Sequence, residues 1–179
     1  MEKLCMILPL ALILCFLVGC QDKEAMAELE EFRAQAALEE ENRALVRRTF
    51  DELNKQNEAV YQELYAPEYG WYFPANNPTA LTREQEAGFV KLLWAAFPDI
   101  RWDIVEMVAS GDTVLVRFSV SGTHKGEYQG LQPTGKTFET GALWMAHIKD
   151  GKLVEVREEA DVLGWIQQLG MELKSKEKE

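Results

Sequence analysis

The chain has 179 residues, of which 30 are acidic and 19 are basic, and its formal net charge at pH 7 is −11. This acidity argues against electrostatic binding to nucleic acid or to anionic lipid headgroups, so no nucleic-acid partner is expected. Hydrophobic residues make up 47% of the chain, which is enough to build a core for one domain.

The first segment is a mostly apolar run from Leu4 to Gly19, followed directly by Cys20 and a polar, acidic stretch. The run is too short to span a bilayer comfortably, and a small residue precedes the expected cleavage point. We therefore predict a bacterial lipoprotein signal peptide over residues 1–19, with Cys20 as the lipidated first residue of the mature protein. An N-terminal membrane helix or an ordinary secretory peptide is the alternative, and Glu2 departs from the basic start of a typical signal.

These features predict an exported protein that is attached to the cell envelope, and to a membrane, through its lipid anchor. Gln21 follows the lipidated cysteine in place of the aspartate that commonly retains lipoproteins in the inner membrane, which favours the outer membrane where the cell has one. Cys5 and Cys15 leave with the signal, so the mature protein keeps no free thiol. This excludes a disulfide, a cysteine nucleophile and a thiolate metal site.

Residues 22–54 contain no proline or glycine and are rich in strong helix formers, which predicts one long helix or two abutting helices. The first part has few large apolar residues and many carboxylates, so we interpret residues 20–40 as a solvated helical stalk; a coiled-coil partner helix is the alternative. From Leu45 onward apolar residues recur at helical spacing, and the folded domain is predicted to span residues 41–170. Residues 171–179 are expected to form a charged, disordered tail.

The predicted domain begins with helices and continues with a sheet. Helices are expected at residues 59–65 and 82–97, the second with Thr82 as its N-cap, and a short aromatic strand at residues 69–73. Four extended stretches rich in Val, Ile, Phe and Trp follow, at residues 101–109, 113–123, 136–148 and 153–160. Turn sequences between the first two and between the last two are expected to form antiparallel hairpins. The pattern predicts the α+β class, with a sheet curled over helices.

Several motifs in this domain resemble those of one known family. They are, in chain order, Phe97-Pro98-Asp99, Gly111-Asp112, residues 122–130, Pro133-Thr134-Gly135, Asp150-Gly151-Lys152 and residues 161–170. In order and spacing, the domain resembles the SnoaL-like polyketide cyclase (ester cyclase) family. The resemblance implies a cone of the nuclear transport factor 2-like fold, in which a curved antiparallel sheet wraps around a long N-terminal helix and leaves a pocket at its open end.

The resemblance also implies an activity, an intramolecular aldol ring closure that needs no metal and no organic cofactor. In that chemistry one aspartate removes a proton from an activated carbon and returns a proton to the carbonyl oxygen. The matching residue here is Asp161, and His124 of the Thr-His-x-Gly segment is the second candidate catalytic residue. Capping of a final helix at residues 162–169 explains Asp161 equally well, and ordering of a turn is the alternative for His124.

The last predicted strand departs from the family pattern, because Val156 and Arg157 stand where relatives usually carry a histidine and a tryptophan. Strict alternation without a bulge would place Arg157, Glu159 and Asp161 on one face of the strand. We therefore expect Arg157 on the pocket wall, where its charge would lower the pKa of Asp161. A solvent-facing row of ion pairs is the alternative.

Aromatic residues give the best evidence for a ligand. The predicted substrate-binding residues are Tyr69, Trp71, Phe73, Trp94, Trp144 and Arg157. Core packing is the alternative for every aromatic residue in this set. The two histidines, His124 and His147, share no partner at a familiar metal-ligand spacing, so no metal site is predicted.

The predicted strand at residues 136–148 is apolar on both faces, with Leu143 and Met145 on the outer one, so a homodimer through the sheets is expected. The sequence thus predicts a SnoaL-like lipoprotein that binds a small, polyketide-like molecule with carbonyl groups and catalyses a cyclisation or isomerisation by carboxylate acid/base chemistry. A noncatalytic ligand-binding or protein-interaction module of the cell envelope is the alternative, which the acidic stalk and the charged last strand favour.

Overall fold

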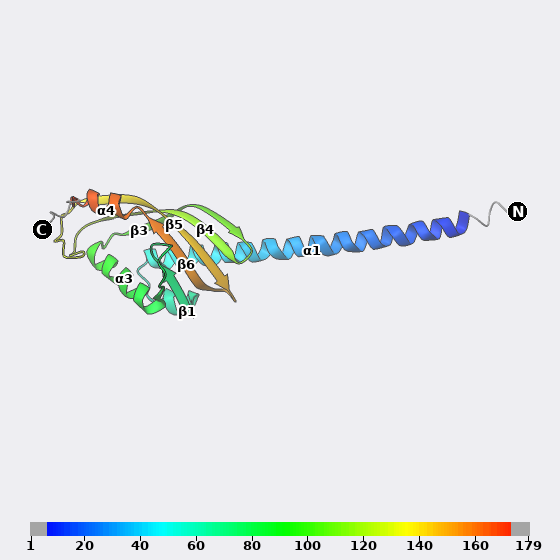
Figure 1. Cartoon of the computed structure of the whole chain (residues 1–179), viewed down its shortest axis with the longest axis horizontal. Helices are drawn as coiled ribbons and strands as arrows, with labels where there is room; N and C mark the ends of the chain where they lie inside the picture. The colour runs from blue at the N-terminus through cyan, green and yellow to red at the C-terminus, as the bar shows by residue number, and fades with distance from the viewer. Residues whose placement is uncertain (1–6, 173–179) are drawn as a thin grey trace. The chain divides into compact units, whose positions relative to one another are not determined.

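The computed structural model describes the backbone of residues 7–172 and the side chains of residues 23–172. It divides the chain into two compact units, residues 1–38 and residues 39–179, and helix α1 (Ile7–Asn54) contributes to both (Figure 1). The start of the predicted signal peptide, the side chain of Cys20 and most of the predicted C-terminal tail lie outside the described residues. Within the described part of the chain, no helix is both long and apolar enough to cross a membrane.

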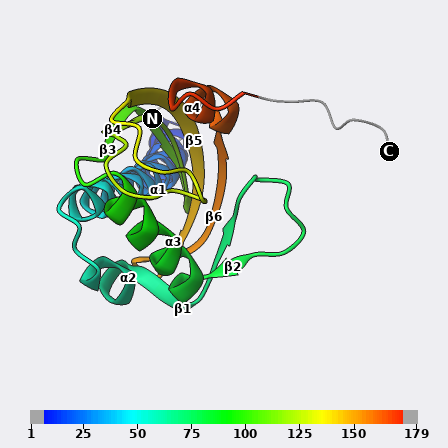
Figure 2. The same cartoon turned by 90° about the vertical axis from the view of Figure 1, so that its left-hand side faces the viewer.

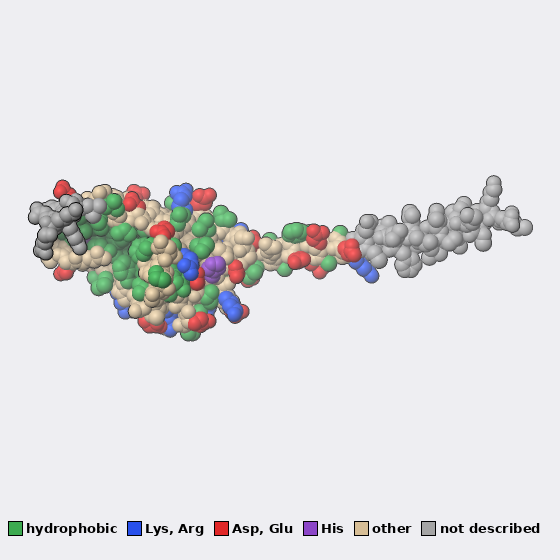
Figure 3. Space-filling model, viewed as in Figure 1, with side chains coloured by type: hydrophobic (Ala, Val, Ile, Leu, Met, Phe, Trp, Pro, Cys, Tyr) green, Lys and Arg blue, Asp and Glu red, His purple; other side chains and the backbone are tan. Residues whose placement is uncertain are grey.

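In the first unit, the side chains of residues 23–38 are exposed. They include large apolar residues, such as Phe32 with 62% of its surface exposed, among many carboxylates (Figure 3). One continuous helix covers the segment for which one helix or two abutting helices were predicted. These exposed side chains are what a solvated stalk requires.

The second unit holds the rest of the fold. After α1 come, in chain order, α2 (Ala59–Leu64), β1 (Tyr65–Tyr72), β2 (Leu81–Thr82), α3 (Arg83–Ala96), β3 (Arg101–Ser110), β4 (Thr113–Thr123), β5 (Thr137–Lys149), β6 (Lys152–Ala160) and α4 (Val162–Gln168). The described strands form one curved, open sheet in the order β2-β1-β6-β5-β4-β3, with α1 and α3 inside its curve (Figure 2). The β1–β6 pair is parallel and the other pairs are antiparallel. The predicted α+β class and both predicted hairpins are confirmed.

Helix α3 begins where its local sequence predicts. The Gln85 backbone N–H donates to the Thr82 hydroxyl over 3.3 Å, and the Thr82 N–H donates to the Gln85 side chain over 2.8 Å. This reciprocal capping box fixes the helical register from its first turn. In that register Glu86 falls on the same buried stripe as Val90 and Leu93. The helix therefore carries a carboxyl group into the interior of the domain.

Strand β1 begins at Tyr65, earlier than the aromatic strand predicted for residues 69–73. Tyr65 lies opposite Leu153 of β6, and Trp71 lies opposite Val156. This parallel pairing joins segments that are far apart in the sequence, so nothing local to β1 indicates it. The helix predicted over residues 59–65 therefore ends one residue earlier, at Leu64, and Tyr65 belongs to the strand.

Strands β4 and β5 alternate between a buried and a more exposed face. On the buried face, Phe118 and Trp144 pack against Phe50 of α1, with ring centroids 5.0 and 4.9 Å from the Phe50 ring. On the other face, Leu143 and Met145 are exposed. Both faces of β5 are thus apolar, as predicted.

Strand β6 does not alternate strictly. Its pairing with β5 shifts between two neighbouring residues of β5, because His147 lies opposite Glu155 whereas Ile148 lies opposite Leu153. The extra residue on β6, Val154, makes a β-bulge that reverses which residues face the interior. Beyond the bulge, Val156 is fully buried.

The bulge corrects one expectation about the pocket. Strict alternation placed Arg157 on the pocket wall, and this is wrong, because Glu158 faces the interior in its place, opposite Trp144 of β5. Arg157 and Glu159 lie on the other face of β6. A carboxyl group, and not a guanidinium group, is therefore the charged group that β6 contributes to the interior.

Candidate functional site

A small, partly open cavity of about 40 Å³ lies in the interior of the domain, between α1, α3 and the sheet. Its lining is mainly aromatic and aliphatic, with two carboxyl groups: Phe50, Leu53, Trp71, Glu86, Phe89, Val90, Leu93, Trp102, Phe118, Trp144 and Glu158. Carboxyl groups in such apolar surroundings titrate far from their usual range, which is a property of many catalytic sites. This cavity is the candidate site.

Glu158 is held by two indole groups. The Nε1–H groups of Trp71 and Trp144 each donate to Oε2 of Glu158 over 2.9 Å. Burial raises the pKa of Glu158 to about 7, although both indole hydrogen bonds favour the ionised form and act in the opposite direction. Glu158 is therefore a carboxyl group that ionises near neutral pH and whose orientation is fixed.

Glu86 is the more deeply buried of the two, with 2% of its surface exposed. The Tyr61 hydroxyl lies 3.5 Å from its Oε1, and Oε2 has no hydrogen-bond partner among the described residues. Burial raises the pKa of Glu86 to about 8; the nearby charge of Glu158 adds to this, and the hydroxyls of Tyr69 and Tyr61 oppose it. Glu86 is therefore mostly protonated at pH 7 and can donate a proton into the cavity.

Three tyrosine rings stand next to Glu86. The ring centroids of Tyr61 and Tyr65 are 4.6 Å apart, and those of Tyr65 and Tyr69 are 4.8 Å apart. Burial raises the pKa of all three hydroxyls above the ordinary value of tyrosine. The hydroxyls thus stay protonated on the Glu86 side of the cavity, where the Tyr61 hydroxyl donates to Oε1 of Glu86.

Of the substrate-binding residues predicted from the sequence, the structure places Trp71 and Trp144 together in the cavity wall, on Glu158. Phe73 stacks on Trp71, with ring centroids 5.3 Å apart and planes 5° apart. Tyr69 belongs to the tyrosine group next to Glu86. Trp94 is buried in the core and is not part of the cavity lining.

Arg157, the remaining predicted substrate-binding residue, is engaged on the other face of β6. Its Nε donates to Glu155 Oε1 over 2.8 Å, and its Nη1 donates to the backbone carbonyl of Ala75 over 2.9 Å. The guanidinium carbon also lies 4.1 Å from the centroid of the Tyr72 ring. Arg157 therefore holds the chain segment that follows β1, and its described ion pair is with Glu155 and not with Asp161.

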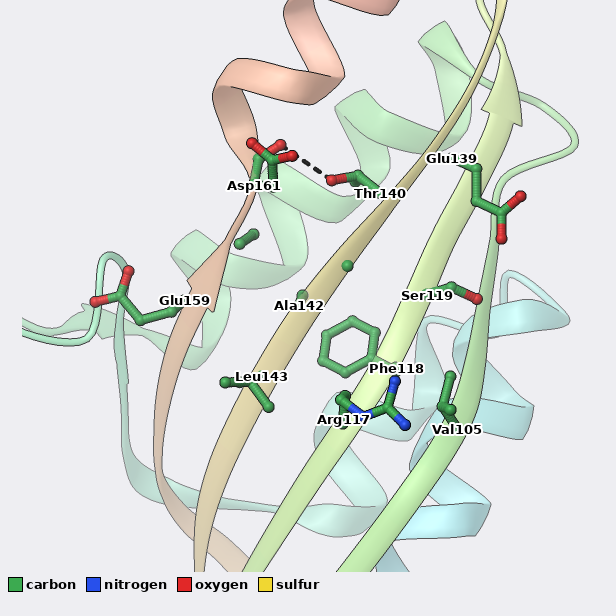
Figure 4. Close-up of a pocket in the computed structure, with 12 residues that line it drawn as sticks. Val105, Arg117, Phe118, Ser119, Glu139, Thr140, Ala142, Leu143, Glu159 and Asp161 are labelled. Carbon is green, nitrogen blue, oxygen red and sulfur yellow. Dashed lines mark hydrogen bonds between the residues drawn. The ribbon is translucent and has the colours of Figure 1, made fainter.

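Asp161, the first predicted catalytic residue, is exposed and caps α4. Its Oδ1 accepts the backbone N–H of Gly164 over 2.8 Å. It lies along an open groove of about 680 Å³ on the outer face of the sheet, where Thr140 donates to the Asp161 carbonyl over 3.0 Å (Figure 4). The outer groove and the interior cavity are separate places, so Asp161 does not meet Glu86 or Glu158.

His124, the second predicted catalytic residue, is fully buried at the end of β4. Its Nδ1 accepts the backbone N–H of Thr134 over 3.2 Å, and its backbone N–H and carbonyl bond to Lys136 and Gly135. The ring packs on Phe97, 5.2 Å between centroids. These contacts close the loop before β5, and the ring is not part of the cavity lining. A role of His124 or Asp161 in catalysis stays a prediction.

The sequence analysis missed both interior carboxyl groups. A signal for Glu86 was present, because it shares the helical spacing of the apolar residues Val90 and Leu93. No comparable signal existed for Glu158, since its direction depends on the bulge in β6. In the described part of the chain, no three His, Cys, Asp or Glu side chains are grouped so that they could hold a metal ion.

Comparison with known proteins gives the same family as the motifs. The sequence model of the SnoaL-like polyketide cyclase family matches residues 44–169. Aklanonic acid methyl ester cyclase AcmA from Streptomyces galilaeus is 28% identical over 130 residues, which cover 71% of this chain and 89% of AcmA. Aklanonic acid methyl ester cyclase DnrD from Streptomyces peucetius is 30% identical over 96 residues, which cover 53% of this chain and 66% of DnrD.

Solved structures show the same fold. The crystal structure of wild-type IdmH from Streptomyces antibioticus superimposes with a TM-score of 0.65 at 28% sequence identity, and the match covers 73% of this chain and 99% of IdmH. The curved sheet around a long N-terminal helix is the arrangement that the motifs implied. This chain therefore belongs to the SnoaL-like polyketide cyclase family and has its nuclear transport factor 2-like fold.

Proposed function

We propose that this protein is a cofactor-independent enzyme that moves protons on a carbonyl compound inside the cavity, in an isomerisation or an aldol-type cyclisation. One observation carries the proposal: Glu158 is fixed by the indoles of Trp71 and Trp144 in a small, mainly apolar cavity that it shares with a second carboxyl group, Glu86. Family membership supports a small-molecule ligand with carbonyl groups.

The two carboxyl groups differ in the protonation state that their surroundings favour. The indole hydrogen bonds favour ionised Glu158, whereas deep burial and the nearby charge of Glu158 favour neutral Glu86. At pH 7, pKa values of about 7 and about 8 leave Glu158 partly ionised and Glu86 mostly protonated. Two carboxyl groups in different protonation states are the arrangement needed for a base and an acid in one site.

The proposed reaction begins when Glu158 removes a proton from the carbon next to the substrate carbonyl. The electron pair of the broken C–H bond forms the enolate, and its oxygen accepts a hydrogen bond or a proton from Glu86, assisted by the hydroxyl of Tyr61. In an isomerisation of a β,γ-unsaturated carbonyl compound, Glu158 returns its proton to the γ carbon of the dienol, while the O–H proton goes back to Glu86 and the C=O bond re-forms. In an aldol closure, the enol carbon attacks a second carbonyl, the enol O–H proton goes back to Glu86, and the new alkoxide takes the proton from Glu158.

The experiment that tests the proposal follows exchange of hydrogen for deuterium next to the carbonyl of butanone, a ketone whose uncatalysed exchange is slow at neutral pH. We expect the full chain to catalyse this exchange in D₂O and Glu158→Gln to lose about 100-fold or more of the rate. Gln keeps an acceptor for the two indoles, so the variant removes the base while the hydrogen bonds remain.

Glu159→Gln is the matched control, because Glu159 is the next residue of β6 and lies on the opposite face. Its rate should equal that of the wild type. Exchange that survives Glu158→Gln but is lost in Asp161→Asn would transfer the base role to the outer groove. No exchange by the wild-type protein would favour a noncatalytic ligand-binding or protein-interaction module.

We also propose that the domain is exported and attached to a membrane through a lipid on Cys20. The apolar segment that ends in Gly19-Cys20 supports this proposal. Cells fed a labelled fatty acid should transfer the label to the wild-type protein and not to Cys20→Ser. Labelling of both proteins would place the lipid on another residue. Labelling of neither would show that the protein carries no lipid.

A homodimer through the outer face of the sheet is the third proposal. Leu115, Leu143 and Met145 are exposed side by side on this face, since Leu115 lies opposite Met145 in the β4–β5 pair. Hydrophobic side chains gather among the charged ones on the face of the domain seen in Figure 3. Contact with a second copy would remove this apolar surface from water.

A further inference from the structure

The charge of the interior cavity restricts what it can bind. Among its described lining residues, two carry carboxyl groups and none is Lys, Arg or His. Arg157, the nearest basic residue along β6, is turned to the other face. An anionic ligand would meet two carboxyl groups and no cation in a medium of low dielectric constant. A ligand without charge meets a neutral donor, the protonated carboxyl group of Glu86, and an acceptor, Glu158.

The volume of the cavity restricts the ligand further. At about 40 Å³ it has room for a molecule of only a few non-hydrogen atoms, whereas sites for drug-sized ligands measure about 300–1,000 Å³. Large aromatic side chains take up the remaining space, above all Trp71, Trp102 and Trp144, each at most 9% exposed. A molecule with fused rings does not fit between them.

Phe89 occupies a special place in this wall. Nine lining residues are buried, and the remaining two, Phe89 and Glu158, reach the surface in part. The Phe89 ring centroid lies 5.5 Å from that of Trp71, whose indole holds Glu158. Phe89 is thus the one partly exposed apolar side chain among the described lining residues, and it packs on the indole that holds the proposed base.

Glu86 adds to the cavity wall a polar group whose hydrogen bonding is incomplete. Its Oε2 is fully enclosed and has no hydrogen-bond partner among the described residues. An enclosed polar atom without a partner costs about 1–3 kcal/mol, which a ligand that supplies the missing hydrogen bond would recover. A carbonyl oxygen that accepts from the protonated carboxyl group is such a partner.

We propose that the interior site takes small, uncharged carbonyl compounds, and that Phe89 sets the upper limit of their size. This proposal rests on the proposed function for the location of the site. It assigns a substrate class smaller than fused-ring polyketides, and it names a specificity-determining residue on α3.

Saturation-transfer NMR on the full chain at pH 7 tests the proposal with three probes. Butanone and propionate have the same shape and differ in charge, and 2-tetralone is an uncharged ketone with two fused rings. We expect the wild type to bind butanone about tenfold or more tightly than propionate and to show no saturable binding of 2-tetralone. Phe89→Ala should gain saturable binding of 2-tetralone.

Two further variants serve as controls for the loss of a side chain on α3 and for folding. Leu92→Ala removes a comparable side chain from the same helix at a position that is 65% exposed, and it should bind as the wild type does. Phe89→Leu keeps most of the bulk, so it should fold even if Phe89→Ala does not, and should bind 2-tetralone with intermediate affinity. Equal binding of 2-tetralone by wild type and Phe89→Leu would overturn the size limit.

The preference for uncharged ligands is tested separately. Binding of propionate as tightly as butanone would overturn it. Failure of this proposal can be told apart from failure of the proposed function. Selective butanone binding without deuterium exchange would overturn catalysis and leave the ligand class standing. Deuterium exchange into butanone together with binding of 2-tetralone by the wild type would overturn the size limit and leave catalysis standing. Binding of none of the three probes would overturn this proposal.

Discussion

At the scale of single residues, the main feature is a pair of glutamates that the fold encloses without a cationic partner in the cavity. Glu158 has two indole donors on one oxygen, and Glu86 has an oxygen without a partner. Enclosed carboxyl groups destabilise a fold when they ionise, because ionisation occurs without full solvation. Retaining both glutamates therefore lowers the free energy of unfolding at neutral and higher pH.

The pH dependence of stability follows from these pKa values. The folded chain keeps a proton on Glu86 up to about pH 8, whereas an unfolded chain releases it near the ordinary value of 4.5. Between those values unfolding releases protons, so the free energy of unfolding should fall as the pH rises. Urea denaturation of Glu86→Gln should show a smaller fall from pH 5 to pH 8, by about 1–3 kcal/mol.

Glu68→Gln is the control for this comparison, because Glu68 is exposed on β1 and its substitution should leave the fall unchanged. Glu158→Gln should behave as Glu86→Gln does, except that its effect accumulates between about pH 4.5 and pH 7 and does not grow above pH 7. The groups that interact with Glu86 are Tyr61, Tyr69 and Glu158, so its titration is coupled mainly to that of Glu158. Identical pH profiles of wild type and both variants would show that the glutamates titrate normally.

At the scale of elements, the two faces of β6 carry side chains with different roles. Glu158 points inward to the cavity, while Arg157 and Glu159 hold the segment after β1 by bonding the carbonyl and the N–H of Ala75. That segment follows Phe73, which stacks on Trp71. The strand thus supports the indole that orients Glu158 as well as carrying Glu158 itself.

The end of β6 leads into α4, and here Asp161 acts as a helix cap. Asp161→Ala should lower the free energy of unfolding by about 0.5–2 kcal/mol, because the Gly164 N–H loses its acceptor. Asp161→Asn keeps an acceptor and should retain most of that stability. Thermal unfolding of the two variants measures the difference.

The same two variants separate capping from catalysis. If Asp161 only caps α4, both should exchange deuterium into butanone at the wild-type rate at temperatures where they are folded. Loss of exchange in Asp161→Asn at unchanged stability would contradict the structural role and support the catalytic prediction.

At the scale of the whole molecule, the two faces of the sheet differ in what they cover. The inner face encloses the cavity against α1 and α3, while the outer face exposes Leu115, Leu143 and Met145 next to charged residues such as Arg117. Figure 4 shows Leu143 and Arg117 on neighbouring strands of the outer groove. Such an apolar and charged surface matches the composition of many protein interfaces.

Light scattering on the full chain tests the proposed dimer. Met145→Lys should shift the measured mass from dimer to monomer, because the interface would have to enclose an unpaired ammonium group. Leu92→Lys places the same charge on exposed α3 and should leave the mass unchanged. A wild-type monomer, or a dimer that tolerates Met145→Lys, would contradict an interface at this position.

Much of the fold could be predicted from short stretches of sequence. The capping box at Thr82, the turns that join β3 to β4 and β5 to β6, and the alternation along β4 and β5 all follow from interactions within a few residues. Gly111 and Gly151, with φ of 59° and 69°, occupy turn positions that favour glycine. The order of these elements and the motifs between them also identified the family.

The candidate site could be predicted only in part. The sequence pointed to Trp71 and Trp144 as ligand-binding residues, and these are the two donors that hold Glu158. It did not point to Glu158 itself, because the bulge at Val154 depends on how β6 pairs with β5. One residue of slippage exchanges the inner and outer faces of a strand, and no local pattern reports it.

The sequence by itself therefore determined the elements, the hairpins and the family, since these depend on local propensities and on the spacing of motifs. Only the tertiary structure decided which carboxyl groups share the interior, that Asp161 and Arg157 lie outside it, and how little space remains there. These properties arise where α3, β1, β5 and β6 meet. Their geometry is fixed by packing between segments that are distant in sequence, where pairing register and side-chain volume decide the outcome.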